Sequence, residues 1–407
     1  MTNDIGRRIA ELRARRGMTQ EELAENAGIS ISVVKKLEQG GTSRMESYTA
    51  IARALGVVTL MFVPRSGPPH YTETDDARQQ MLTDMRKAVM PPVRWDGSAF
   101  RYDVEDDDLD LERLGQALRS LVQAYHGNRC EFVGQAMPAV IRSAHAHVDG
   151  VAPGSQRETA LRLRSCALQL AGRYLILIRE HDLALSALRE ALKDAVEVGD
   201  KILALNITGN QARVMIRQGW FREVEQLCLA AIRELEPGKS MQADELTARG
   251  WLLLRASAAA ARNNRPQDAD EYLEAASAVA NDLGTEHVDA GHMYFGPLTV
   301  ATKRTENAVL AGYPEKALEH AAKLPTNVGS MAPAGWQQHL LHCADALIMT
   351  KQHEKATELL DGLRSQAPEW LHHQRYARDL VRSLLKTRKR TFTDKQRDLA
   401  DFLSLDM

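Results

Sequence analysis

The sequence has no long hydrophobic run and no apolar stretch near its N-terminus. Its longest such runs, for example Val57 to Val63, fall far short of the roughly 20 residues that a membrane-spanning helix needs. The first residues are charged and periodic, unlike the hydrophobic region of a secretory signal peptide. We therefore expect a cytoplasmic protein without a membrane partner.

Cysteine is scarce, and neither sign of charge dominates. The four cysteines lie far apart and form no C-x-x-C pair: Cys130, Cys166, Cys228 and Cys343. This usage favours buried thiols in a reducing compartment. The 52 basic and 54 acidic side chains give a net charge of −2. A chain-wide polycation is thereby excluded, so any surface for nucleic acid must be local.

Motifs of common enzyme and cofactor sites are missing as well. No G-x-G-x-x-G motif follows a strand, and no P-loop, H-E-x-x-H or G-x-S-x-G segment occurs. His145 with His147, and His339 with His342 and Cys343, are the only metal-like clusters. Ordinary helix histidines are the favoured interpretation of both. We predict neither an enzyme nor a protein with a cofactor or metal ion.

Alternating β-branched runs are nearly absent, and helical periodicity takes their place. From about residue 109 onward, apolar side chains recur at three- and four-residue spacing. We predict an all-α protein in three parts. Residues 1–65 form a compact domain, 66–105 a proline-containing linker with a short helix near 77–89, and 106–407 a domain of helical repeats.

The first 65 residues carry a local excess of positive charge and the punctuation of short helices. They contain ten basic and seven acidic side chains. Thr19 to Glu22 has the pattern of a capping box at a helix start, and Gly28 suits a sharp turn. A further helix is expected over residues 31–39, with Val34 and Leu37 pointing inward. Two helices joined by a tight glycine turn predict a helix-turn-helix.

Met18 to Gly40 and Ile51 to Gly56 resemble the Cro and phage-repressor (XRE) type of helix-turn-helix. The resemblance implies a lambda-repressor-like fold in which Arg13 and Glu38 form a buried ion pair. It implies that Gln20 contacts a phosphate and braces the following helix, whose exposed side faces the major groove. The residues that it assigns to DNA are Gln20, Ser30, Ile31, Ser32, Lys35, Lys36, Ser43 and Arg44.

The remaining chain shows a repeated pattern of an apolar helix, a short turn, and a second helix with a small residue near its start. The small positions of five copies are Ala184, Val224, Ala269, Ala317 and Ala356, separated by 40, 45, 48 and 39 residues. Residues 127–132 form a degenerate first copy. The pattern resembles the tetratricopeptide repeat (TPR), which implies a TPR-like α-solenoid with a concave groove.

Polar side chains on the first helix of each repeat are candidates for binding a ligand in that groove. Asparagine amides pair with a peptide backbone, and arginine holds a carboxylate. Solvated or inter-helix polar roles are the alternative for each residue. The predicted effector-binding residues are Asn206, Asn210, Arg213, Arg217, Arg173, Trp251, Lys303 and Glu306.

The combination of an XRE helix-turn-helix with TPR-like repeats resembles the peptide-responsive quorum-sensing regulators of Gram-positive bacteria and the long XRE regulators of high-GC bacteria. It implies a homodimeric transcription regulator on an inverted-repeat site in double-stranded DNA, controlled by a peptide or small-molecule effector. The alternative is a TPR-based interaction scaffold that the helix-turn-helix tethers to DNA. Whether the protein represses or activates stays open, as does the role of the basic stretch 375–397.

Overall fold

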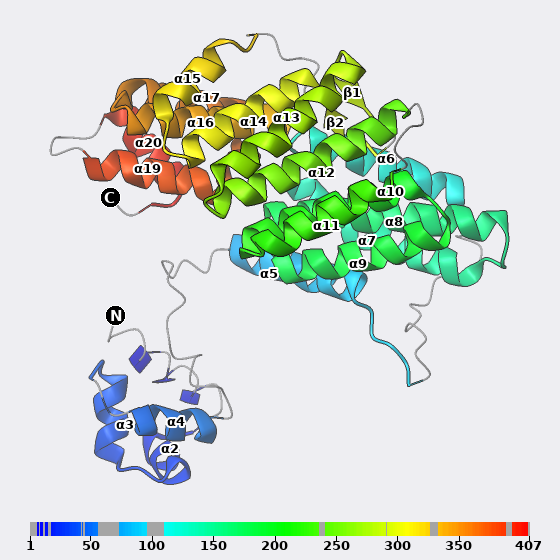
Figure 1. Ribbon diagram of the computed structural model, residues 1–407. Helices are drawn as coiled ribbons and strands as arrows, with labels where there is room; N and C mark the ends of the chain where they lie inside the picture. The colour runs from blue at the N-terminus through cyan, green and yellow to red at the C-terminus, as the bar shows by residue number, and fades with distance from the viewer. Residues whose placement is uncertain are drawn as a thin grey trace. The chain divides into compact units, whose positions relative to one another are not determined.

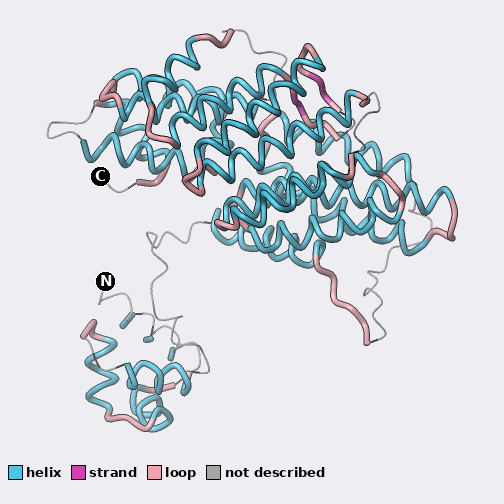
Figure 2. The backbone as a smooth tube through the Cα atoms, viewed as in Figure 1, coloured by secondary structure: helices cyan, strands magenta, loops and turns pink. Residues whose placement is uncertain are grey.

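The structure, a computed structural model, divides the chain into two compact units, Met1–Ala77 and Arg78–Met407 (Figure 1). It describes residues 6–7, 9–10, 13–14, 18–41, 43, 45–55, 73–95, 110–235, 241–289, 291–325, 333–387 and 393–405. Within these ranges the regular structure is helical apart from one pair of two-residue strands (Figure 2). The predicted all-α class is confirmed.

The described helices of the first unit are α2 (Gln20–Ala27), α3 (Ile31–Glu38) and α4 (Met45–Ala54). Helix α3 lies within one residue of the range predicted for it, 31–39. Their apolar sides share one buried cluster, to which α3 contributes Val34 and Leu37 as predicted.

Local sequence explains how α2 begins and ends. The Thr19 hydroxyl accepts the Glu22 backbone N–H at 3.1 Å, and the Glu22 carboxylate accepts the Thr19 backbone N–H at 2.7 Å. The predicted capping box is therefore confirmed. Gly28 ends the helix with a φ of 62°, a left-handed conformation that glycine adopts without steric cost. Ser30 stands at the start of α3, but its side chain makes no capping hydrogen bond.

The second unit begins within α5 (Glu73–Val89) and continues as consecutive helix pairs. In each pair, the first is called the A helix and the second the B helix. The pairs are α6 (Leu111–His126) and α7 (Cys130–Gly150), α8 (Ser155–Leu177) and α9 (His181–Glu197), α10 (Lys201–Gln218) and α11 (Phe221–Arg233), α12 (Ala243–Arg262) and α13 (Pro266–Leu283), α14 (Pro297–Leu310) and α15 (Pro314–Ala322), and α16 (Pro333–Met349) and α17 (His353–Gln366).

Every A-to-B turn has the same backbone geometry. One residue in each turn has a positive φ between 56° and 84°: Asn128, Arg179, Gly219, Asn264, Gly312 and Lys351. The next residue donates its backbone N–H to the carbonyl five positions earlier, at 2.8–3.0 Å in all six turns. This is the Schellman arrangement of a helix C-terminus. The segment 127–132 thus forms a complete first turn of the array.

The five small positions predicted from the sequence all lie at contacts between A and B helices. Ala184, Val224, Ala269, Ala317 and Ala356 are each at most 1% exposed. A larger side chain there would hold the two helices of a pair apart. The predicted repeat pattern is therefore confirmed in its physical basis as well as its positions.

The array returns on itself at its C-terminal end. After α17 come α18 (Pro368–His372), α19 (Arg375–Thr387) and α20 (Asp394–Phe402). Helix α18 contacts α7, and the Glu131 backbone N–H donates to the Glu369 carboxylate at 3.0 Å. Buried side chains of α5 to α10 and of α16 to α20 belong to one apolar cluster.

A β-hairpin interrupts the helical array between α13 and α14. Strands β1 (His287–Val288) and β2 (Tyr294–Phe295) pair antiparallel. Phe295 is fully buried against Gly250 of α12, where an added Cβ would lie only 2.0 Å from the Phe295 ring. A glycine at this position is therefore what lets the hairpin pack against α12. The sequence analysis did not predict this element.

Candidate functional site

The outer face of α3 presents polar side chains to solvent. Ser32, Lys35 and Lys36 are exposed, whereas Val34 and Leu37 on the opposite side are buried. Lys35 Nζ lies 3.9 Å from Glu21 Oε1, and both side chains are at least half exposed. Such a surface ion pair contributes little, so both lysines are available to an anionic partner.

A carboxylate beneath this face fixes α3 to its neighbours. Glu38 accepts the Nε and a second guanidinium N–H of Arg13, at 2.7 and 3.1 Å. It also accepts the Gln20 amide at 2.6 Å, and the Glu38 side chain is only 7% exposed. The predicted Arg13–Glu38 ion pair is confirmed. Gln20 braces α3 from the start of α2.

The other predicted DNA-binding residues flank α3. The hydroxyls of Ser30 and Ser32 lie 2.9 Å apart, and Ile31 is half-buried against the core of the first unit. Ser43 donates its hydroxyl to Ser47 at 3.0 Å, at the start of α4. Arg44 lies outside the described residues.

The predicted asparagines of α10 are used within the chain. Asn206 is buried and donates its amide to Asp289 of the hairpin at 2.6 Å. Asn210 is 1% exposed and donates to the Asn206 carbonyl at 3.0 Å. Their amides hold the hairpin and the helix, and the same helix face continues toward two arginines.

Arg213 and Arg217 lie one turn apart on that face of α10, and no carboxylate of the described residues pairs with either. Neither forms a hydrogen bond or ion pair that involves another described residue. Arg217 reaches solvent, yet surrounding protein and the positive charge of Arg213 lower its pKa to about 10. The Arg217 guanidinium therefore stays charged at neutral pH.

Arg255 of α12 joins these two arginines, and the sequence analysis missed it. Its Nε donates to the Gly209 carbonyl of α10 at 3.2 Å, and its guanidinium lies over the Trp251 ring at 4.6 Å. Burial, then Arg213, lower its pKa to about 9. The available signal was its position four residues after Trp251, which places both side chains on one helix face.

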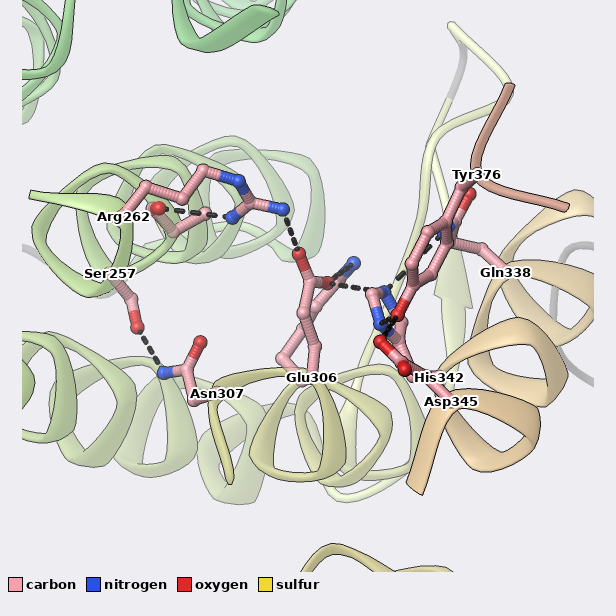
Figure 3. A network of polar contacts seen from close by, with 10 residues as sticks. Ser257, Arg262, Glu306, Asn307, Gln338, His342, Asp345 and Tyr376 are labelled. Carbon is pink, nitrogen blue, oxygen red and sulfur yellow. Dashed lines mark hydrogen bonds and ion pairs between the residues drawn. The ribbon is translucent and has the colours of Figure 1, made fainter. Parts of the chain in front are cut away.

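The predicted pair Lys303 and Glu306 on α14 is neutralised internally. Glu306 is buried and accepts Lys303 at 2.7 Å and Arg262 at 2.8 Å, and Figure 3 shows it lying between Arg262 and His342. Burial favours its protonated form, but Lys303 and Arg262 hold its pKa well below the usual range. His342 in turn contacts Tyr376 of α19. Glu306 therefore serves as a counter-charge.

The remaining predicted effector residues contact the hairpin end of the same face. Trp251 donates its indole N–H to the Tyr294 carbonyl at 2.9 Å. Arg173 of α8 lies 4.8 Å over the Tyr125 ring and 3.5 Å from the His126 ring nitrogen. His126 stacks near His292 of the hairpin, and burial lowers its pKa to about 3. Arg173 is thus grouped with the hairpin, apart from the other arginines.

Two further features concern partners that the sequence analysis excluded. In the part of the chain that the structure describes, no three His, Cys, Asp or Glu side chains are grouped to hold a metal ion. Likewise, none of the described helices combines the length and apolar character needed to cross a bilayer.

The geometry defines the first unit as a helix-turn-helix domain and the second as an array of stacked helix pairs. Residues 4–60 match the model of a family described as "Helix-turn-helix domain". This match confirms the prediction for the N-terminal part of the chain. No curated protein matches the chain.

Several solved structures are similar to the chain at low identity. PlcR of Bacillus thuringiensis, in complex with the peptide PapR7 and DNA, is 13% identical, with a TM-score of 0.31 over 79% of this chain and 97% of that one. PrgX is 12% identical, with a TM-score of 0.25 over 98% of each chain. The competence regulator ComR from Streptococcus vestibularis is 14% identical, with a TM-score of 0.22 over 80% and 99%.

Proposed function

We propose that the chain is a sequence-specific DNA-binding regulator of transcription that presents α3 to the major groove. The observation that carries this proposal is the exposed polar face of α3, held in place from behind by Glu38. Lysine donates to guanine O6 and N7, and isoleucine contacts a thymine methyl. The proposed DNA-binding residues are Gln20, Ser30, Ile31, Ser32, Lys35, Lys36, Ser43 and Arg44.

The regulator is proposed to act as a homodimer in the cytoplasm. One helix-turn-helix makes only a few phosphate contacts, which bind DNA weakly at physiological salt. Dimers of this class gain specificity by placing two such helices on half-sites about one helical turn apart. The operator is accordingly an inverted repeat.

The effector of the regulator is proposed to bind the A-helix face of the second unit. The candidate residues are Asn206, Asn210, Arg213, Arg217, Arg173, Trp251, Lys303 and Glu306, with Arg255 added. Among these residues, the arginines that pair with no described carboxylate are proposed to contact the effector directly. Asn206 and Glu306 instead position the hairpin and the neighbouring cations. A peptide or small molecule that binds one dimer geometry more tightly than another shifts the dimer toward that geometry. Its effect on operator affinity is limited by the difference between its two binding free energies.

The first test is selection of genomic and random DNA by the full-length protein and by Lys35→Ala with Lys36→Ala. We expect the wild type to enrich an inverted repeat and the double variant to lose that enrichment, because both lysines face outward. The matched control is Lys355→Ala with Lys395→Ala, which removes the same charge from exposed positions of α17 and α20. It should behave as the wild type does.

Equal enrichment by the double variant would show that α3 does not read DNA. Enrichment of no sequence by the wild type, joined with a stably co-purifying protein, would instead favour an interaction scaffold tethered to DNA.

A further inference from the structure

We propose that the effector carries an anionic group, a carboxylate or a phosphate, that Arg213, Arg217 and Arg255 hold together. The proposal rests on the effector site proposed above and names the chemistry of its ligand. These three are called the open arginines. They come from adjacent A helices, α10 and α12, which the Arg255 hydrogen bond to Gly209 joins.

The balance of charge around the open arginines is strongly positive. Arg262 lies near Arg217, Lys303 lies near Arg255, and Glu306 is the carboxylate close to all four. That carboxylate already accepts hydrogen bonds from Arg262 and Lys303. No described acidic side chain pairs with the open arginines. Like charges in excess of their counter-charge cost folding free energy, and a bound anion offsets that cost.

The Arg255 guanidinium is also held in one orientation that suits a planar anion. The Trp251 ring and the Gly209 carbonyl fix the orientation of Arg255. A fixed guanidinium loses less conformational entropy when it binds a carboxylate or phosphate in bidentate fashion. The lowered pKa values of Arg217 and Arg255 are consistent with this shielded, positively charged setting.

The chain itself already places a carboxylate on the same face. Asp289 of the hairpin accepts the Asn206 amide, two turns before the first open arginine on α10. The hairpin therefore occupies the asparagine end of this face with an acidic group of its own. The arginine end is left without one.

The test uses two anionic probes and one variant of the full-length protein. A heptapeptide array samples all net charges with free C-termini, and calorimetry with pyrophosphate samples the phosphate source. The variant is Arg213→Gln with Arg217→Gln. The matched control is Arg189→Gln with Arg222→Gln, which removes the same charge from exposed B-helix positions.

We expect the wild type to bind acid-rich peptides or pyrophosphate, and the variant to bind the same probe roughly a hundredfold more weakly. Each charge-assisted hydrogen bond lost corresponds to about tenfold. The control should match the wild type. Because Arg213 and Arg217 have no described partner, the variant should also melt at the same temperature or higher.

If the protein prefers acid-rich peptides, the anionic group is a carboxylate of a peptide and not a phosphate. If it prefers pyrophosphate, the anionic group is a phosphate. The proposal itself is overturned by enrichment of neutral or basic peptides, by equal binding to the variant, or by no binding of either probe below about 1 mM. None of these results touches the operator selection, so the regulator can stand if the anionic ligand fails. A missing operator would remove the regulator while leaving the anion site.

Discussion

At the scale of single residues, Glu38 holds α3 in place with one buried carboxylate. The opposite face of the same helix stays exposed to solvent. The resemblance to the XRE type of helix-turn-helix was sufficient to predict this contact with Arg13, because it implies a buried ion pair at these two positions.

Replacing Glu38 with Gln should destabilise the first unit. The change removes a charge-assisted pair and leaves the Arg13 guanidinium, whose side chain is 19% exposed, without its anion. We expect a loss of about 1–3 kcal/mol. Faster hydrogen exchange of the α3 amides in the full-length protein measures it. The control is Glu21→Gln, whose 3.9 Å contact with Lys35 is exposed. Comparable exchange in both variants would contradict the role given to Glu38.

His339 is a residue that only the folded environment could reveal as sensitive to pH. Burial, then Lys303, lower its pKa from 6.5 to about 4. The unfolded chain therefore takes up a proton at a higher pH than the folded one. The folding stability that depends on neutral His339 is fully present above pH 6.5 and is lost as the pH falls toward 4.

In His339→Gln, the acid sensitivity of the protein should decrease. Urea unfolding near pH 7 and near pH 5.5 gives the pH-dependent loss of stability for each protein. We expect the loss to be about 1 kcal/mol smaller in the variant. His353→Gln serves as the comparison. An unchanged difference between the two pH values would show that His339 takes up its proton at the same pH in the folded and unfolded chains.

At the scale of elements, the helix pairs could be predicted because their signals are local. Small residues at Ala184 and its equivalents mark where B helices cross A helices, and Gly or Asn often marks the turn. Arg179 and Lys351 are neither, and a histidine two residues further on, His181 or His353, marked those turns in the sequence. The hairpin could not be predicted, because its strands have two residues each and its contacts reach α10 and α12.

Gly219→Ala tests the shared turn geometry directly. Gly219 has a φ of 84°, and an alanine there adopts a left-handed conformation that costs about 1 kcal/mol. We expect the free energy of unfolding to fall by that amount in urea titrations. Gly209→Ala is the matched control, because Gly209 lies inside α10 and an added Cβ meets nothing within 4 Å. That change should be neutral or stabilising.

At the scale of the whole second unit, the array departs from a simple stack in which each pair contacts only its neighbours. The α18 contact with α7 joins segments that are more than 200 residues apart in the sequence. No periodic pattern encodes such a contact, since it depends on the small rotations accumulated over all the intervening pairs. The contact between α18 and α7 therefore could not be predicted from the sequence.

Trp370→Ala tests whether the contact between α18 and α7 makes the two ends of the array unfold cooperatively. Trp370 of α18 is 5% exposed and belongs to the apolar cluster that includes α7. Removing so large a buried side chain costs about 3–5 kcal/mol. If the ends stabilise one another, hydrogen exchange should quicken in α7 as well as in α17 to α20. Trp220→Ala is the control, because Trp220 is 44% exposed and should leave α7 unchanged. Faster exchange confined to the C-terminal helices would mean that the ends touch without sharing stability, and that α7 is held by its own pair alone.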